Sequence, residues 1–252
     1  STHCAIQIVP ALPTPTLLLS ALHRAMGRLM PSTCLLCDDQ MESMHGLCDG
    51  CLQGLPWNTS ACRRCALPLM VGHLCGACQT RPGAYDEVVA PVIYREPVDR
   101  IVCELKYSAR LPWARTAAGL IVDTIHHRGE PVPDLLVPVP MTPRAVRRRG
   151  FHPSATIARL VAKHLKIRTN ETMVTKRRET ERQSTLTHRE RALNIGGAFE
   201  VRQHPIGRTK LVLIDDVVTT GSTVAELARI LKQAGASEVR VWAFARTPGN
   251  RL

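Results

Sequence analysis

Eight of the ten cysteines in this 252-residue chain form four Cys-x-x-Cys pairs. The pairs are Cys34/Cys37, Cys48/Cys51, Cys62/Cys65 and Cys75/Cys78. They are separated by ten, ten and nine residues, and these spacers hold few large apolar side chains. Because such a segment has too little apolar surface for a core of its own, something other than hydrophobic burial must hold it in shape.

Metal binding is the interpretation that the spacing favours. A Cys-x-x-Cys turn presents two thiolates to one tetrahedral ion, and a second turn completes the shell without leaving an open position. The four pairs therefore predict two structural Zn²⁺ ions. We expect the first pair to join the second and the third to join the fourth, with the first joined to the third as the alternative. His45 and His73 lie close enough to compete as ligands but are expected to be bystanders.

The same cysteines bear on where the protein works. Redox-active Cys-x-x-Cys motifs are the rival interpretation, but such motifs usually follow a strand in a thioredoxin-like unit. The opening residues lack the basic start of a signal peptide, and no apolar run approaches the roughly 18 residues of a membrane span. We expect a cytoplasmic protein. An amphipathic helix over residues 16–30 is expected to pack on its own protein, with peripheral membrane contact as the alternative.

Beyond Gly83 the composition changes to alternating strand-like and helix-like segments, which predict an α/β fold with a parallel sheet and helices on both faces. The chain is expected to divide into a lead with the amphipathic helix (1–33), a cysteine-rich zinc module (34–83) and the α/β domain (84–252). The polar segment 176–195 is long enough to be an active-site lid. Strands are expected at 88–94, 135–139, 173–175, 211–218 and 238–245, and helices at 98–107, 113–127, 154–166 and 223–234.

The stretch LVLIDDVVTTGSTV, residues 211–224, places two aspartates at the end of an apolar strand. In an open α/β sheet, ligands bind at the carboxyl ends of the strands, where Asp215 and Asp216 would accept hydrogen bonds from hydroxyls or meet a cation. The residues that follow are hydroxyl-bearing and open a helix, whose N-terminus favours an anion. Together the two features predict a site for a phosphorylated sugar.

This stretch resembles the motif that binds 5-phosphoribosyl 1-pyrophosphate (PRPP) in type I phosphoribosyltransferases. The resemblance implies that Asp215 and Asp216 face the ribose 2′- and 3′-hydroxyls and that Mg²⁺ accompanies the ligand. It also implies that the 5-phosphate is held by Thr219, Thr220, Gly221, Ser222 and Thr223.

The whole chain from about Leu22 onwards resembles the ComF family, in which a double zinc ribbon precedes a phosphoribosyltransferase-like domain. The segments that carry this resemblance include PSTCLLC, ELKY with Lys106, VPVP followed by RRRGF, and FARTP. Where the family commonly has Gly-Phe-Asn-Gln, this chain has Gly150-Phe151-His152-Pro153. His152 is interpreted either as a substitute donor or as a neutral replacement at a helix entry, where Pro153 suits the first turn.

Basic residues dominate the middle of the α/β domain. The formal net charge is +12, and such a surface attracts phosphates. Candidates to hold the pyrophosphate, or to close over it from the loop, are Lys106, Arg144, Arg148, Arg178, Arg182 and Arg191. The same arginines are candidates for the backbone of single-stranded DNA; with only 4% aromatic residues, backbone attraction is expected to outweigh base reading.

Function follows from the resemblance as an expectation. A ComF-like protein would bind PRPP with Mg²⁺ and take part in DNA uptake or use of external DNA, with single-stranded DNA and other uptake proteins as partners. The alternatives are a nucleobase phosphoribosyltransferase of nucleotide salvage and a sensor that binds the sugar diphosphate without turnover. No base-recognition loop is evident in the sequence, so whether the chain is an enzyme stays open.

Overall fold

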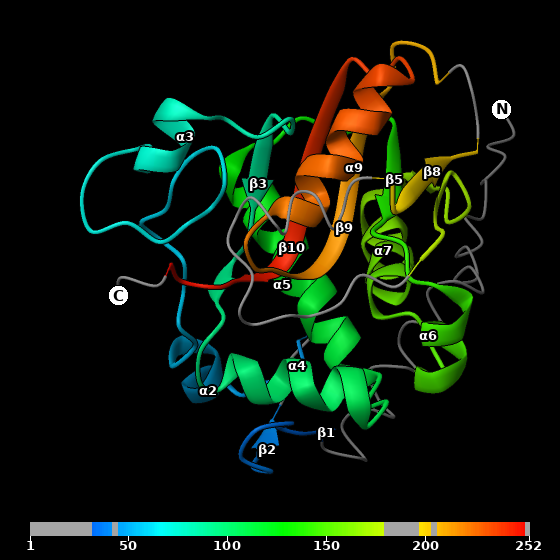
Figure 1. Ribbon diagram of the computed structural model, residues 1–252. Coiled ribbons are helices and arrows are strands. Elements are labelled where there is room, and N and C mark those ends of the chain that lie inside the picture. Colours follow the sequence, from blue (N-terminus) through cyan, green and yellow to red (C-terminus); the bar gives the residue numbers. More distant parts are fainter. Residues whose placement is uncertain (1–31, 42–44, 179–196, 203–205, 250–252) are drawn as a thin grey trace, which may run out of the picture.

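A six-stranded sheet lies at the centre of the computed structural model, which describes residues 32–41, 45–178, 197–202 and 206–249 (Figure 1). The strand order is β3-β10-β9-β5-β6, with the short β4 also paired to β10, and every pairing is parallel. The parallel α/β sheet predicted from the sequence is confirmed. The strands are β3 (Glu87–Val89), β4 (Val92–Ile93), β5 (Leu135–Pro138), β6 (Arg168–Thr169), β9 (Lys210–Val218) and β10 (Glu238–Arg246).

The strand β9 is central because both of its faces are covered. Leu211, Val212, Leu213 and Ile214 are all fully buried. Leu211 and Leu213 pack on the side of α9, whereas Val212 and Ile214 pack on the side of α4, α5 and α7. Each such side chain contributes about 2 kcal/mol when it is withdrawn from water, so this run of four apolar residues sets the position of β9 in the sheet.

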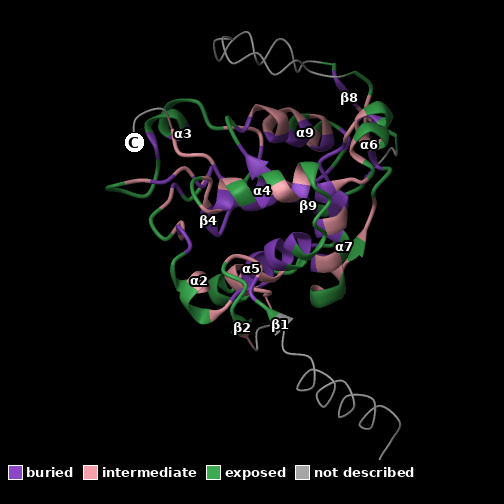
Figure 2. Cartoon of the chain, turned by 90° about the horizontal axis from the view of Figure 1, so that it is seen from below, coloured by how far each residue is buried: buried purple, intermediate pink, exposed green. Residues whose placement is uncertain are grey.

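Helices cover the two faces of the sheet in separate layers. In Figure 1, α9 lies in front of β9 and β10, and Figure 2 shows that buried residues gather where the helices face the strands. The helices are α4 (Val98–Tyr107), α5 (Pro112–Arg128), α6 (Pro143–Arg149), α7 (Pro153–Leu165) and α9 (Ser222–Gln233). Among the described segments, no helix is long and apolar enough to cross a membrane.

The direction of the chain across the sheet reverses between β5 and β9. From β5 the chain passes through α7 to β6 on one side, and it later returns to β9 and β10 on the other. Such a reversal leaves a crevice at the carboxyl ends of the two strands, and ligands of open α/β sheets bind there. The fold therefore directs attention to the ends of β5 and β9.

The cysteine-rich segment passes along the β3 edge of the sheet, from β1 (Ser32–Thr33) and β2 (Gln40–Met41) at the bottom of Figure 1 to α3 (Gly76–Thr80) at the upper left. The helix α2 (Asp49–Gln53) lies between them in sequence. Trp57 bridges to Val92, and the amide of Val88 donates to the carbonyl of Arg64. These backbone contacts join the segment directly to the edge strands.

Four expectations of local structure either differ from the fold or fall at least partly outside the described residues. The strand expected at 88–94 is two short strands, because Ala90 and Pro91 interrupt the pairing with β10. Residues 143–149, where no helix was expected, form the short helix α6, which Thr142 caps and Pro143 begins. Of the lid expected at 176–195, only residues 176–178 are described, and Lys176 is the last residue of β7 (Val174–Lys176). β7 pairs antiparallel with β8 (Phe199–Val201). The amphipathic helix expected at 16–30 is also outside the described residues.

Candidate functional site

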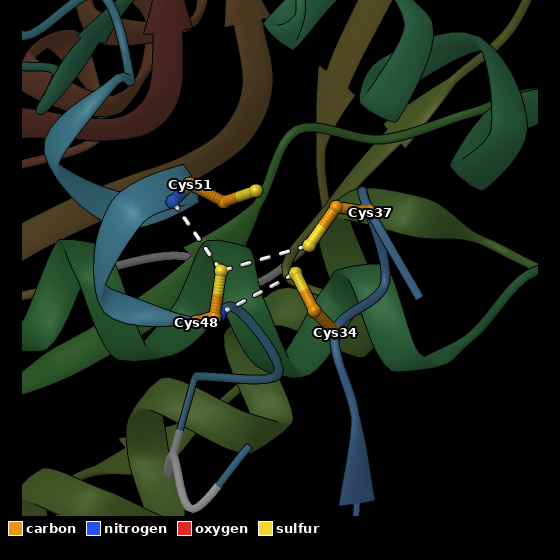
Figure 3. Close-up of side chains that lie close together, drawn as sticks. All are labelled: Cys34, Cys37, Cys48 and Cys51. Carbon is orange, nitrogen blue, oxygen red and sulfur yellow. Dashed lines mark hydrogen bonds between the residues drawn. The ribbon is translucent and has the colours of Figure 1, made fainter. Parts of the chain in front are cut away.

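The eight paired cysteines come together as two groups of four, in sequence order. In each group the four sulfur atoms all lie within 4.8 Å of one another. Figure 3 shows the first group, with sulfurs converging from two segments and Cys37 Sγ 3.6 Å from Cys48 Sγ. Cys65 Sγ and Cys75 Sγ are the same distance apart in the second group. The groups are Cys34, Cys37, Cys48 and Cys51, and Cys62, Cys65, Cys75 and Cys78.

Backbone amides donate hydrogen bonds to one cysteine sulfur in each group. The amide of Cys48 donates to Cys34 Sγ at 3.3 Å, and the amide of Cys75 donates to Cys62 Sγ at 3.4 Å. Burial acts to raise the pKa of Cys34, but these amide contacts outweigh it and lower the pKa to about 6. The same balance lowers the pKa of Cys62 to about 7. Four cysteine sulfurs that lie this close together fit a tetrahedral structural zinc ion in each group.

The two nearby histidines are not members of these groups. His45 Nε2 lies 2.9 Å from Asp123 Oδ2 on α5, and His73 is exposed. The groups differ in their surroundings: every cysteine of the second is buried, whereas Cys37 of the first is exposed. The second group packs in the α9 layer and the first in the layer of α4, α5 and α7. The two metal sites therefore lie on opposite sides of the sheet.

Asp215 and Asp216 lie near the carboxyl end of β9, at the reversal point of the sheet. Asp215 Oδ1 accepts hydrogen bonds from Ser154 Oγ at 3.1 Å and from the amide of Asp216 at 2.9 Å. Lys106 Nζ at the end of α4 lies 2.7 Å from Asp216 Oδ1, and both side chains are largely buried. The structure thus brings β9, α7 and α4 together around the two acids.

The two acids differ in how their negative charge is balanced. Asp216 has Lys106 as a direct partner. Asp215 keeps some contact with solvent, but burial and then the charge of Asp216 raise its pKa to about 7, against the lowering effect of Lys106. A perturbed carboxyl group at a ligand edge is typical of a functional site. A cation or a set of hydroxyl donors would stabilise the charged form.

The segment from Thr219 to Thr223 forms a turn that leads from β9 into α9. Gly221 has a φ of +79° and precedes the first residue of the helix, a conformation that costs other residues more. A hollow of about 30 Å³ is lined by Asp215, Thr219, Gly221 and Thr223, together with three valines. One acid and the residues that begin α9 therefore line the same small space.

The basic candidates lie in different places. Arg144 and Arg148 are exposed on α6, just beyond the end of β5. Arg149 of the same helix lies over the ring of Tyr107, 5.5 Å from its centre. Arg178 is exposed after β7, whereas Arg182 and Arg191 are outside the described residues. Lys106 is engaged with Asp216, so the structure places it beside the acids.

His152 occupies the N-cap position of α7, with Pro153 as the first helical residue. The amide of Ala155 lies 3.2 Å from His152 Nδ1, and the amide of Met141 lies 3.2 Å from Nε2. Burial lowers the pKa of His152 and so favours the neutral ring. A neutral imidazole has a single acceptor nitrogen, so one of these two contacts is a hydrogen bond at a time. The side chain accepts here, as a helix cap does.

Sequence reasoning missed three residues of this region. Ser154 donates to Asp215. Tyr85 is buried beside Gly221, where a Cβ on the glycine would lie 3.4 Å from the tyrosine hydroxyl. Arg246, at the end of β10, reaches the backbone of the turn after β9. Of these three residues, only Arg246 had a signal in the sequence, because it is an arginine that ends an apolar strand, in the stretch WAFAR.

Two family models match the chain. Residues 25–79 match the double zinc ribbon domain, and residues 147–252 match the phosphoribosyl transferase domain. These matches agree with the two Cys4 groups and with the parallel sheet. The protein is therefore of the phosphoribosyltransferase type in its α/β fold, with a double zinc ribbon region before it.

Full-length relatives narrow this class to one family. The DNA utilization protein YhgH of Escherichia coli (strain K12) is 34% identical over 224 residues, which cover 86% of this chain and 98% of that protein. Competence protein F of Haemophilus influenzae is 27% identical over 224 residues, covering 84% and 96%. The chain belongs to the ComF family. A solved purine phosphoribosyltransferase from Pyrococcus horikoshii aligns over 54% of this chain and 87% of that one, with 12% identity and a TM-score of 0.32.

Proposed function

We propose that this protein binds PRPP with Mg²⁺ at the carboxyl end of β9. The observation that carries the proposal is the pair Asp215 and Asp216 beside the hydroxyl-rich turn that opens α9. Carboxylates accept hydrogen bonds from vicinal ribose hydroxyls, and the exposed amides of a helix N-terminus favour a phosphate. The 5-phosphate is assigned to Thr219, Thr220, Gly221, Ser222 and Thr223.

The other groups of the site are assigned to charge balance. Mg²⁺ bound with the ligand supplies positive charge to the diphosphate oxygens. Lys106 keeps Asp216 paired at 2.7 Å, and Ser154 orients Asp215. The diphosphate end of the ligand is assigned to five arginines, because one guanidinium group can donate two hydrogen bonds to a phosphate group. They are Arg144, Arg148, Arg178, Arg182 and Arg191.

We further propose that the protein works in DNA uptake or utilisation in the cytoplasm and contacts single-stranded DNA through α6. The names of the relatives, DNA utilization protein and Competence protein F, support the process. The contact is supported by exposed arginines on α6 and by Tyr107, which is 68% exposed beside Arg149. Cationic side chains bind the DNA backbone, and an exposed ring stacks on a base.

Calorimetric titration with PRPP and Mg²⁺ tests the ligand assignment. We expect binding by the natural protein, and loss of binding in Asp215→Asn with Asp216→Asn while both zinc ions are retained. Glu96→Gln, at an exposed acid, is the control. Equal affinity in the doubly substituted protein would show that the site is assigned wrongly.

Release of pyrophosphate in the presence of a panel of nucleobases separates the candidate roles. Release with one free base would indicate a salvage transferase. Binding without release, together with a change in affinity for single-stranded DNA, supports the DNA-linked role. Binding without release and without any effect on DNA would indicate a sensor.

A salt titration tests the DNA contact. We expect Arg148→Ala to reduce the slope of log K against log salt by about 0.7 for a single strand, which is the contribution of one phosphate contact. Tyr107→Ala is expected to weaken binding without changing that slope, since stacking releases no counterions. Leu111→Ala, also exposed, is the control. Affinity that does not change from low to high salt contradicts the electrostatic account.

A further inference from the structure

Arg246 is a buried cation whose partners are backbone carbonyl groups. The residue is only 6% exposed. Nε donates to the carbonyl of Cys65 at 2.9 Å, and Nη1 donates to the carbonyl of Val218 at 3.1 Å. Nη1 also contacts the carbonyls of Thr219 and Thr247. Within the described residues no carboxylate pairs with this guanidinium, so the carbonyl oxygens alone offset the cost of burying its charge.

These carbonyls belong to two different parts of the proposed sites. Val218 is the last residue of β9, and Thr219 is the first residue of the turn that is assigned to the 5-phosphate. Cys65 is a member of the second Cys4 group. The planar guanidinium group therefore spans from the backbone of the zinc group to the backbone of the phosphate turn, and its fixed fork holds the two at one separation.

Packing strengthens the same connection. All four cysteines of the second group belong to one buried cluster with Tyr85, Val218 and Val224. A Cβ on Gly221 would lie 3.4 Å from the hydroxyl of Tyr85, so this ring packs against the turn. Thr247 adds two hydrogen bonds to the carbonyl of Val218, from its amide at 3.1 Å and from Oγ1 at 3.0 Å. A shift of the second group would therefore be transmitted to the turn.

The first Cys4 group has a different set of neighbours, which makes it a matched control. Thr116 Oγ1 on α5 donates to the carbonyl of His45, and His45 pairs with Asp123 of the same helix. Cys34 packs with α4 and α5, on the opposite side of the sheet from α9. Within the described residues, no hydrogen bond joins this group to the phosphate turn.

We propose that Arg246 is a positioning residue that couples the second zinc site to the phosphate turn. Occupancy of that site then sets the affinity for the sugar phosphate, whereas occupancy of the first site does not. The inference rests on the proposed function, because it concerns how the PRPP site is held in shape. The presence or absence of zinc in the second site would therefore change the affinity for the sugar phosphate through the guanidinium group of Arg246.

The first experiment measures Arg246→Lys with ribose 5-phosphate and with PRPP and Mg²⁺. Lysine keeps the charge but is a single point donor, so it cannot hold carbonyls on both sides in a planar fork. We expect the Kd for both ligands to rise by about 10-fold, within the range of ordinary coupling energies. Zinc content and the unfolding midpoint are measured on the same sample to show that the fold is intact.

The second experiment compares loss of one zinc ion from either group. Cys78→Ser removes a ligand of the second group without changing Cys65 itself, and Cys37→Ser removes a ligand of the first. We expect Cys78→Ser to raise the Kd for ribose 5-phosphate by about the same 10-fold, and Cys37→Ser to leave it unchanged. Both variants are tested for a zinc content of one ion per chain.

The double variant Arg246→Lys with Cys78→Ser distinguishes coupling from general damage. If Arg246 carries the coupling, the second substitution adds little to the first, because the two changes break the same link. Additive effects on Kd, or equal effects of Cys37→Ser and Cys78→Ser, would overturn the inference while leaving the PRPP assignment intact. Failure of the natural protein to bind either ligand would instead overturn the proposed function.

Discussion

At the scale of single residues, Asp215 and Asp216 are adjacent acids in contrasting surroundings. Asp216 has a cation at 2.7 Å, whereas the pKa of Asp215 is raised to about 7 by burial and by its neighbour. Without ligand, Asp216 is paired with Lys106, whereas Asp215 is sensitive to pH near neutrality. Two adjacent acids of this kind suit a site whose ligand binds together with a cation.

The raised pKa of Asp215 predicts a pH dependence of stability. The folded state binds the proton more tightly than the unfolded state, so the stabilisation is complete below the unfolded pKa of about 3.9 and is lost as the pH rises towards 7. Asp215→Asn removes this dependence. We therefore expect the stability difference between the variant and the natural protein to change with pH. The unfolding free energy of Asp215→Asn, relative to the natural protein, should rise by about 1–2 kcal/mol as the pH increases from 5.5 to 8.

Urea unfolding of both proteins at several pH values checks this expectation. Comparing the two at each pH cancels the effects of pH on the zinc sites. Glu96→Gln, at an exposed position, should track the natural protein throughout. A constant difference between Asp215→Asn and the natural protein across the range would contradict the assignment of the shift to Asp215.

The ion pair between Lys106 and Asp216 leads to a second prediction about stability. Lys106→Met leaves Asp216 buried without its partner, and breaking such a buried pair costs about 3–5 kcal/mol. We expect that loss in urea unfolding, and substantial recovery when Asp216→Asn is added. Arg229→Met breaks the exposed pair with Glu226 and should cost less than about 1 kcal/mol. If the double variant is no more stable than Lys106→Met, the pair is not the cause.

At the scale of elements, the sequence predicted the long buried strands well and the short polar segments less well. The LVLI run of β9 is stable only in the interior of the sheet, since four successive apolar residues need to be covered on both faces. The stretch that became α6 lacks any apolar periodicity, because none of its residues is buried. Its helical start depends on the cap at Thr142, a signal too local to outweigh four arginines.

The acids and the turn were predicted from their motif, but the contacts that hold them were not. Ser154, Lys106 and Arg246 come from α7, α4 and β10, which are distant from β9 in sequence. Contacts of this kind depend on the strand order, and alternation of strands and helices leaves that order undetermined. The grouping of the cysteines was simpler to predict, because neighbouring pairs need only a short loop to meet.

The cap of α7 gives a prediction for an element. His152→Ala removes the side-chain acceptor, and we expect it to cost about 1 kcal/mol of unfolding free energy. His152→Asn, which restores the residue common in the family, should match or exceed the natural protein, because asparagine is among the best N-cap residues. Urea unfolding compares all three. Equal stability of the alanine and asparagine variants would show that the cap contributes nothing.

At the scale of the whole molecule, the two Cys4 groups lie in different layers and differ in exposure. The first includes the exposed Cys37, and the second is buried throughout. We therefore expect a chelator to remove zinc in two phases of about equal amplitude, the first group before the second. Cys37→Ser should abolish the fast phase only. A single phase in the natural protein, or loss of the slow phase in this variant, contradicts the assignment.

The passage of the cysteine-rich segment around the β3 edge has a consequence for how such proteins diversify. Its backbone pairs with Val88 and Val92, and its cysteines fill parts of the core on both sides of the sheet. A recombination that exchanged this segment between distant relatives would bring mismatched surfaces to both layers at once. The two halves are therefore expected to be inherited together, with substitutions in one followed by compensating substitutions in the other.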